Sequence, residues 1–150
     1  WAGMHSHMKT TRSRGGFVAT YAGMTVAYKT FWESERLSSA EAELFAASEA
    51  AKMGLHLQYV AEELFGLPAT EVTVYVDSSA AIAHATNTSS PGRMKHIDQR
   101  NNWLRLINDT VRLRLEKIPG LVNPADFLTK LFGTAEFQEK KQFYVNNASE

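Results

Sequence analysis

Two short segments near the N-terminus combine the residue types of strands with a turn between them. Residues 15–31 (GGFVATYAGMTVAYKTF) are rich in Val, Tyr and Phe, and the small pair Ala22-Gly23 divides them into two halves. Val and the aromatic residues favour strands, and Gly adopts the backbone conformations that a tight turn needs. The pattern predicts a β-hairpin over residues 15–31.

The strongest periodic segment extends from Ser39 to about Phe65. Ser38 with Glu41 three residues later forms a capping box, and Gly66 marks the end of the segment. The apolar residues at helical spacing are Ala46, Ala50, Met53, Leu57, Val60, Ala61 and Leu64. The spacing predicts a long amphipathic helix with these residues on its inward face.

The rest of the chain alternates short strands and helices. Val72–Val76 (VTVYV) is nearly all β-branched or aromatic, which predicts a strand buried on both faces. Residues 111–115 (VRLRL) alternate apolar and basic residues, as in a half-exposed strand. Helices are expected at residues 80–85, from about 96 to 108 and from 123 to 131. The order of elements predicts one α/β domain over residues 1–136, followed by a weakly ordered tail, residues 137–150.

The composition is that of a globular domain without cysteine. The chain has 150 residues, 44% of them hydrophobic and 21% charged, which are ordinary values for a folded domain. The absence of cysteine excludes a disulfide scaffold, a thiolate zinc site and a cysteine nucleophile. No apolar run approaches the roughly 18 residues of a membrane span, so we expect a soluble, intracellular protein.

Charge is distributed in blocks, although the formal net charge is zero. Residues 1–32 carry +4, residues 33–77 carry −7, and residues 93–117 carry +4 again. An acidic cluster flanked by basic surface is one arrangement by which a neutral protein binds a polyanion. Solvated faces explain such blocks as well, and composition alone favours this second explanation.

Three carboxylates occupy informative positions. Glu43 is predicted on the apolar face of the long helix, where burying an unpaired carboxylate is costly. Asp77 directly follows the strand Val72–Val76, and α/β sheets build their sites at the carboxyl ends of strands. Asp126 lies in the first turn of the last predicted helix, where the helix dipole is an alternative explanation for an acidic residue. Glu41 is explained by the capping box.

Taken together, these carboxylates indicate a metal site. Glu43, Asp77 and Asp126 are hard oxygen ligands suited to Mg²⁺ or Mn²⁺ if they converge at one edge of the fold. Such clusters often hold two ions about 4 Å apart for in-line phosphoryl displacement. None of the five histidines shows the spacing of a zinc site together with a second ligand pair.

Four segments carry the most specific motifs of the chain. They are Leu37–Glu43 (LSSAEAE), Val74–Ile82 (VYVDSSAAI), Lys95–Arg105 (KHIDQRNNWLR) and Asn123–Lys130 (NPADFLTK). In this order they resemble the ribonuclease H domain of copia-type retrotransposon Pol polyproteins. The N-terminal Trp-Ala-Gly and residues 11–18 (TRSRGGFV) are similar to that family as well. The resemblance covers nearly the whole chain.

The resemblance implies a ribonuclease H-like mixed sheet flanked by helices, which hydrolyses the RNA strand of RNA–DNA hybrids with two Mg²⁺ or Mn²⁺ ions during reverse transcription. Glu43, Asp77 and Asp126 match three of the family's four catalytic acids. The fourth belongs to the first, central strand, which precedes Trp-Ala-Gly and lies between the hairpin and Val72–Val76. The chain is therefore expected to be truncated at that strand and, by itself, marginally folded and inactive.

Five residues are candidate contacts to the nucleic acid because they carry hydroxyl or cationic groups. They are Ser78, Ser79, Arg93, Lys95 and Arg100. Cations in loops commonly contact phosphates, but ion pairing within the predicted helix accounts for part of this set about equally well. His96 as a catalytic group is a minor alternative.

The resemblance implies two partners, the RNA–DNA hybrid and the reverse transcriptase module of the same polyprotein. It also implies a location in cytoplasmic virus-like particles or in the nucleus. A catalytically dead remnant, or a host-recruited fold that binds nucleic acid or protein, remains an alternative because the first acid is missing. A related polynucleotidyl transferase, such as an integrase core or a resolvase, is disfavoured by the LSSAEAE and NPADFLTK segments.

Overall fold

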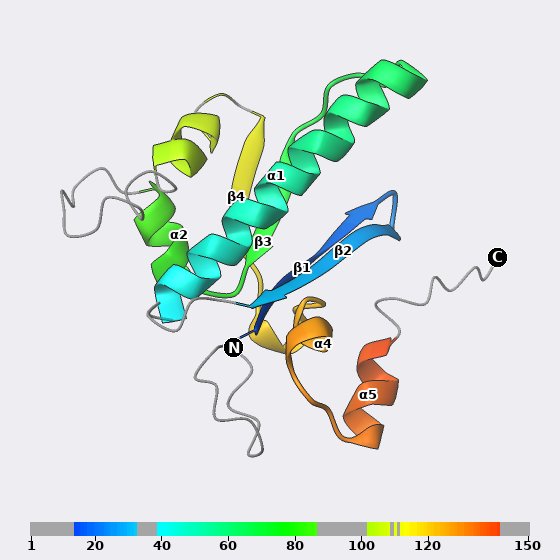
Figure 1. The fold of residues 1–150 in the computed structure, drawn as a ribbon, viewed down its shortest axis with the longest axis vertical. Helices are drawn as coiled ribbons and strands as arrows, with labels where there is room; N and C mark the ends of the chain where they lie inside the picture. Colours follow the sequence, from blue (N-terminus) through cyan, green and yellow to red (C-terminus); the bar gives the residue numbers. More distant parts are fainter. Residues whose placement is uncertain (1–13, 33–38, 87–101, 109, 111, 142–150) are drawn as a thin grey trace. The chain divides into compact units, whose positions relative to one another are not determined.

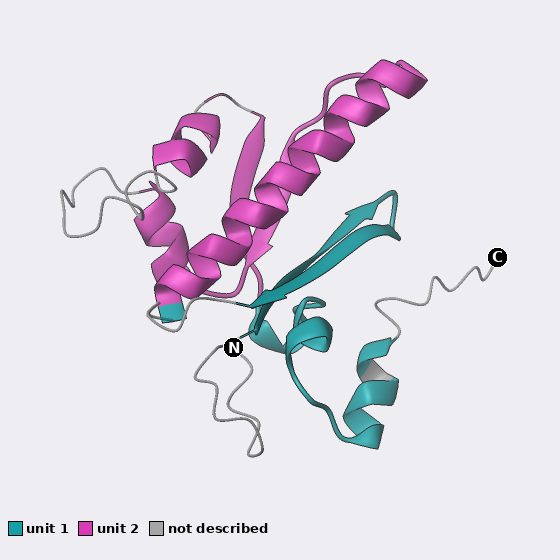
Figure 2. Cartoon of the chain, viewed as in Figure 1, with its two compact units in different colours: residues 1–39, 119–150 teal, residues 40–118 magenta. Residues whose placement is uncertain are grey.

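The computed structural model describes residues 14–32, 39–86, 102–108, 110 and 112–141 (Figure 1). Its contacts divide the chain into two compact units (Figure 2). We call residues 40–118 the α/β unit, and residues 1–39 with 119–150 the hairpin unit. The fold is mixed α/β, as predicted. No helix within the described ranges is long and apolar enough to cross a membrane.

The α/β unit is built on a parallel pair of strands. β3 (Val72–Val76) pairs residue by residue with β4 (Leu113–Lys117). Val74 and Val76 are buried, whereas Tyr75 is 57% exposed because side chains alternate between the two faces of a strand. The predicted bounds of β3 are confirmed, but the prediction that it is buried on both faces is wrong.

One hydrophobic core joins the helices of the α/β unit to this sheet. α1 (Ser39–Phe65), α2 (Ser79–Thr86) and the helix over residues 102–108 all contribute to it (Figure 1). The core residues are Leu44, Ala47, Ala51, Val74, Val76, Ala81, Ala85, Leu104 and Leu113. The predicted bounds of α1 are confirmed, and α2 lies where the small-residue helix was expected.

The buried face of α1 differs from the predicted face. Its buried residues are Ala42, Leu44, Ala47, Ser48 and Ala51. Leu64, which was assigned to the inward face, is 73% exposed. At 100° per residue the centre of the observed stripe lies about two-fifths of a turn from the centre of the predicted one. The other six predicted residues are half-buried, and Ala50 packs against the core, so the predicted face flanks the fully buried stripe instead of coinciding with it. Alanine occupies both stripes, so the difference in hydrophobicity between them is small.

The hairpin unit begins with an antiparallel pair of strands. β1 (Arg14–Tyr21) and β2 (Met24–Trp32) are joined by Ala22 and Gly23. Both turn residues have positive φ angles, 50° and 79°, which matches the twist of a two-residue hairpin. The predicted hairpin and its turn are confirmed.

Short helices follow in the C-terminal part of the hairpin unit. They are η1 (Gly120–Val122), α4 (Asp126–Thr129) and α5 (Thr134–Lys140). Only α4 lies within the helix that was expected from 123 to 131, and it is shorter than expected. A Cβ at Gly16 would lie 2.9 Å from the carbonyl oxygen of Lys29 in β2 and 3.3 Å from Thr129 Cγ2 in α4. The close approach explains why a glycine stands in this strand.

α5 extends past residue 136, where the weakly ordered tail was predicted to begin. The ring of Phe137 lies 4.8 Å from the ring of Phe127, between centroids. Phe127 also stacks on Phe132, with centroids 6.0 Å apart. These ring contacts tie α5 to α4, so the folded part of the hairpin unit reaches at least Lys140.

Two further expectations have partial outcomes. β4 begins at Leu113, two residues later than the strand predicted at 111–115. The helix expected from 96 to 108 is helical over 102–108, and its first half lies outside the described residues.

The described strands form two separate two-stranded sheets, β1–β2 and β3–β4. The ribonuclease H-like five-stranded sheet therefore stays a prediction.

Candidate functional site

Asp77 lies at the carboxyl end of β3, beside the end of β4. The backbone N–H of Ile118 donates to Val76 O at 3.0 Å, so the parallel pairing continues up to the residue before Asp77. The Lys117 ammonium donates a hydrogen bond to the carbonyl oxygen of Asp77. Asp77 is half-buried. A carboxylate-bearing residue and a cation therefore share this edge of the sheet, where α/β folds place their sites.

The turn after Asp77 is fixed by Ser78. Its Oγ accepts a hydrogen bond from Ala81 N at 3.1 Å, and its carbonyl oxygen accepts one from Ile82 N, also at 3.1 Å. These two bonds make Ser78 the N-cap of α2. The cap holds the strand-to-helix turn in one conformation, and this fixes the backbone from which the Asp77 side chain projects.

Glu43 is in the second turn of α1, next to buried Leu44. It is half-buried and lies beside the buried stripe of the helix rather than in its centre. Because Glu43 and Asp77 both belong to the α/β unit, that unit contains two of the three predicted carboxylates.

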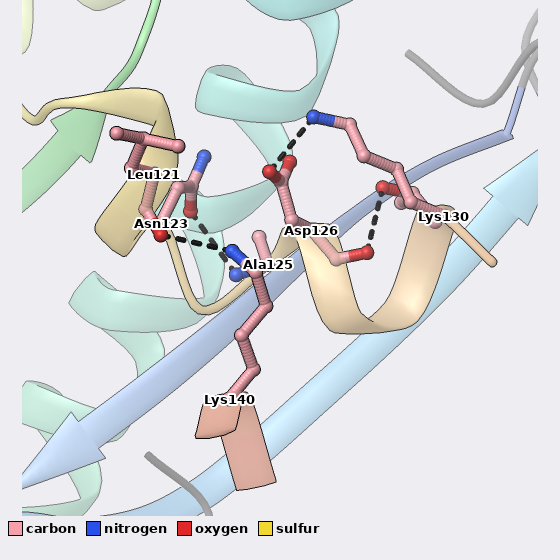
Figure 3. Close-up of polar contacts among 7 residues, drawn as sticks. Leu121, Asn123, Ala125, Asp126, Lys130 and Lys140 are labelled. Carbon is pink, nitrogen blue, oxygen red and sulfur yellow. Dashed lines mark hydrogen bonds and ion pairs between the residues drawn. The ribbon is translucent and has the colours of Figure 1, made fainter. Parts of the chain in front are cut away.

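Asp126 is the third predicted carboxylate, and it belongs to the hairpin unit. The residue as a whole, backbone included, is only 7% exposed. The Lys130 ammonium lies 2.7 Å from its Oδ2 atom, one helical turn further along α4 (Figure 3). A buried carboxylate needs such a partner because its desolvation is costly. The helix dipole, which was the alternative explanation, is weak in a helix of four residues.

The chain around Asp126 is held by further polar contacts. Asn123 Oδ1 accepts a hydrogen bond from Ala125 N at 3.0 Å, and Lys140 Nζ donates to Leu121 O at 2.8 Å (Figure 3). The first bond fixes the turn that leads into α4, and the second connects the end of α5 to η1. The conformation at Asp126 is thus supported from both sides.

Sequence reasoning missed Lys130 as part of this site. The signal that could have found it is its spacing, since residues four apart on a helix are neighbours. The segment NPADFLTK places Asp126 and Lys130 at that distance.

The chemistry of the three side chains fits a hard divalent cation. Carboxylate oxygens are the ligands that Mg²⁺ and Mn²⁺ prefer. Asp126 belongs to one unit and Glu43 and Asp77 to the other, so their convergence stays a prediction. Within the part of the chain that the structure describes, no three His, Asp or Glu side chains form a group that could hold a metal ion.

The candidate contacts to nucleic acid are only partly described. Ser78 is half-buried and serves as a cap, and Ser79 is exposed in the first turn of α2. Arg93, Lys95 and Arg100 lie outside the described residues, as does His96.

No protein-family model matches the chain. Over 142 residues, which cover 94% of its length, the chain is 34% identical to the Retrovirus-related Pol polyprotein from transposon TNT 1-94 of Nicotiana tabacum. The chain is homologous to a segment of a Pol polyprotein. It spans 11% of the length of that relative. This similarity supports the predicted relation to a transposon Pol polyprotein, and the assignment to one domain of such a polyprotein is a proposal.

Proposed function

We propose that the chain is the ribonuclease H domain of a transposon Pol polyprotein and hydrolyses the RNA strand of RNA–DNA hybrids. The observation that carries the proposal is the position of Asp77, at the carboxyl end of a parallel strand and before a capped helix, in a chain homologous to a Pol segment. The motifs around Glu43 and Asp126 support it. Such a domain would act inside the cell beside the reverse transcriptase module of the same polyprotein.

The chain's residues have separate roles in this proposal. Glu43 and Asp77 would ligate metal directly, and Asp126 would hold a second ion or orient the attacking water. Two bound Mg²⁺ or Mn²⁺ ions would supply an activated water and stabilise the leaving 3′-oxygen. Ser78 keeps the backbone at Asp77 in place through its cap on α2. The hybrid would be recognised by its A-like shape and its 2′-hydroxyl groups.

The test is Mg²⁺-dependent cleavage of a hybrid with a labelled RNA strand. It uses the chain itself and the chain extended toward its N-terminus, because the resemblance places a fourth acid upstream. We expect cleavage by the extended chain and a loss of about a hundredfold or more with Asp77→Asn, Glu43→Gln or Asp126→Asn.

The matched control is Glu71→Gln, which neutralises an exposed carboxylate just before β3. This variant should cleave like the parent. Equal cleavage by Asp77→Asn and Glu71→Gln would overturn the proposal. An extended chain that binds the hybrid but does not cleave it with either Mg²⁺ or Mn²⁺ would favour a non-catalytic binding module instead.

A further inference from the structure

The buried carboxylate of Asp126 already has a cation on it. Lys130 Nζ lies 2.7 Å from Asp126 Oδ2, and the two residues are also joined by the bond from Lys130 N to Asp126 O at 2.8 Å (Figure 3). The two side chains differ in exposure, with 36% for Lys130 and 10% for Asp126. The acid is therefore fixed inside the fold, whereas the ammonium that neutralises it has access to solvent.

We propose that Lys130 is a tethered counter-ion that competes with the divalent cation for Asp126 and so sets the metal affinity of the site. The inference rests on the proposed function, because it takes Asp126 to be a metal ligand. An ammonium 2.7 Å from Oδ2 occupies the position from which that oxygen would coordinate an ion. It would also repel a divalent charge placed beside it. Metal binding through Oδ2 then requires Lys130 to release Asp126.

The exposure of Lys130 makes this exchange possible. Its side chain extends along one turn of α4 and can move its ammonium into water without disturbing the packing of α4 on β1. The free energy of the broken ion pair is subtracted from that of metal binding, and the metal in turn lowers the occupancy of the pair. The buried charge of Asp126 stays neutralised in both states, by the ammonium or by the metal.

If the ion pair were purely structural, removing the charge of Lys130 would not change the metal affinity in the same way. Removing the charge of Lys130 would destabilise the metal-free protein in either case, because it leaves a buried carboxylate without a cation. Only competition predicts that the same change tightens metal binding. The stability of the metal-free protein and its affinity for the ion must therefore be measured on the same variants.

The experiment is a titration of the full chain with Mn²⁺, in which electron paramagnetic resonance measures the free ion and thermal unfolding is followed in parallel. The informative variant is Lys130→Gln, whose amide can still donate to Asp126 at helical spacing. We expect Mn²⁺ binding to be about five- to tenfold tighter than in the parent. Lys130→Arg, which keeps the charge, should bind like the parent, and so should Lys141→Gln, which removes an exposed charge from the same unit.

The outcomes separate this inference from the proposed function. Mn²⁺ binding that is lost in Asp126→Asn but equal in the parent and Lys130→Gln would overturn the competition alone. The same would follow if Lys141→Gln tightened binding as much as Lys130→Gln, since general charge would then explain the effect. Absence of any Mn²⁺ binding that depends on Asp126, both in the chain and in the chain extended toward its N-terminus, would overturn the metal site itself, and with it the proposed function.

Discussion

Gly54 of α1 lies so close to Val72 of β3 that a Cβ on the glycine would be 2.5 Å from Val72 Cγ1. Valine is stiff at χ1 and cannot easily move this methyl group away. The helix and the strand approach each other closely here because one of the two residues has no side chain. This contact helps to set the distance between α1 and the sheet that ends at Asp77.

Gly54→Ala is expected to destabilise the protein. Overpacking of a close contact costs about 1–3 kcal/mol, and the better helix propensity of alanine returns up to about 1 kcal/mol. We expect a net loss of about 1–2 kcal/mol in the free energy of unfolding, measured by urea denaturation. The double variant Gly54→Ala with Val72→Ala should cost less than the two single changes combined. Strict additivity would show that the two residues do not touch.

Gly133→Ala is the matched control for this prediction. No atom lies within 4 Å of a Cβ built at Gly133, and its φ of −67° suits any residue. We expect a change in stability within about 0.5 kcal/mol.

The geometry of the hairpin turn leads us to expect that a substitution at Ala22 stabilises the protein. Ala22 has a φ of 50°, a conformation that is unfavourable for alanine and common for asparagine. Ala22→Asn creates the Asn-Gly pair that two-residue hairpins prefer. We expect an increase in stability of about 0.5–1 kcal/mol, and a rise in the melting temperature of about 1–4 °C. A lower melting temperature for Ala22→Asn would contradict the turn geometry.

Ser78 allows a test of its role as a cap. Ser78→Ala removes the acceptor of the bond from Ala81 N and should cost about 1 kcal/mol, whereas Ser78→Asp keeps a good N-cap and should cost much less. Ser79→Ala, at an exposed position, should be nearly neutral. Thermal unfolding of the three variants decides the question, and equal losses for Ser78→Ala and Ser79→Ala would exclude the cap.

The elements that the sequence predicted well are those with strong local signals. β3 is five residues of β-branched and aromatic side chains that end just before Asp77, and the hairpin has a Gly in a two-residue turn. The C-terminal end of α1 is predictable from Gly66, which has a φ of 60° and follows the last residue of the helix. These signals depend on neighbouring residues alone, so the sequence is sufficient to find them.

The failures concern properties that depend on distant residues. The phase of α1 is decided by the contact of Leu44, Ala47 and Ala51 with the sheet, and an alanine-rich helix hardly favours one side. α5 was not predicted because it has few apolar residues, and the ring contact between Phe137 and Phe127 joins it to α4. At the site, the position of Asp77 was predictable from the strand before it. The ion pair of Asp126 was recoverable only from its spacing to Lys130.

Binding of a divalent cation should be visible as a gain in stability. A ligand that binds only the folded protein stabilises it according to its saturation, and for a weakly bound Mg²⁺ or Mn²⁺ we expect about 1–3 kcal/mol at saturating ion. Asp77→Asn should remove most of this gain, because under the proposed function it removes a metal ligand at the carboxyl end of β3 without touching the core. Glu71→Gln, which neutralises an exposed carboxylate just before the opposite end of the same strand, should keep the full gain. The measurement is the shift of the melting temperature between chelator and saturating ion for the three proteins. An identical shift in the parent and Asp77→Asn would show that Asp77 does not hold the ion, even if the protein binds metal elsewhere.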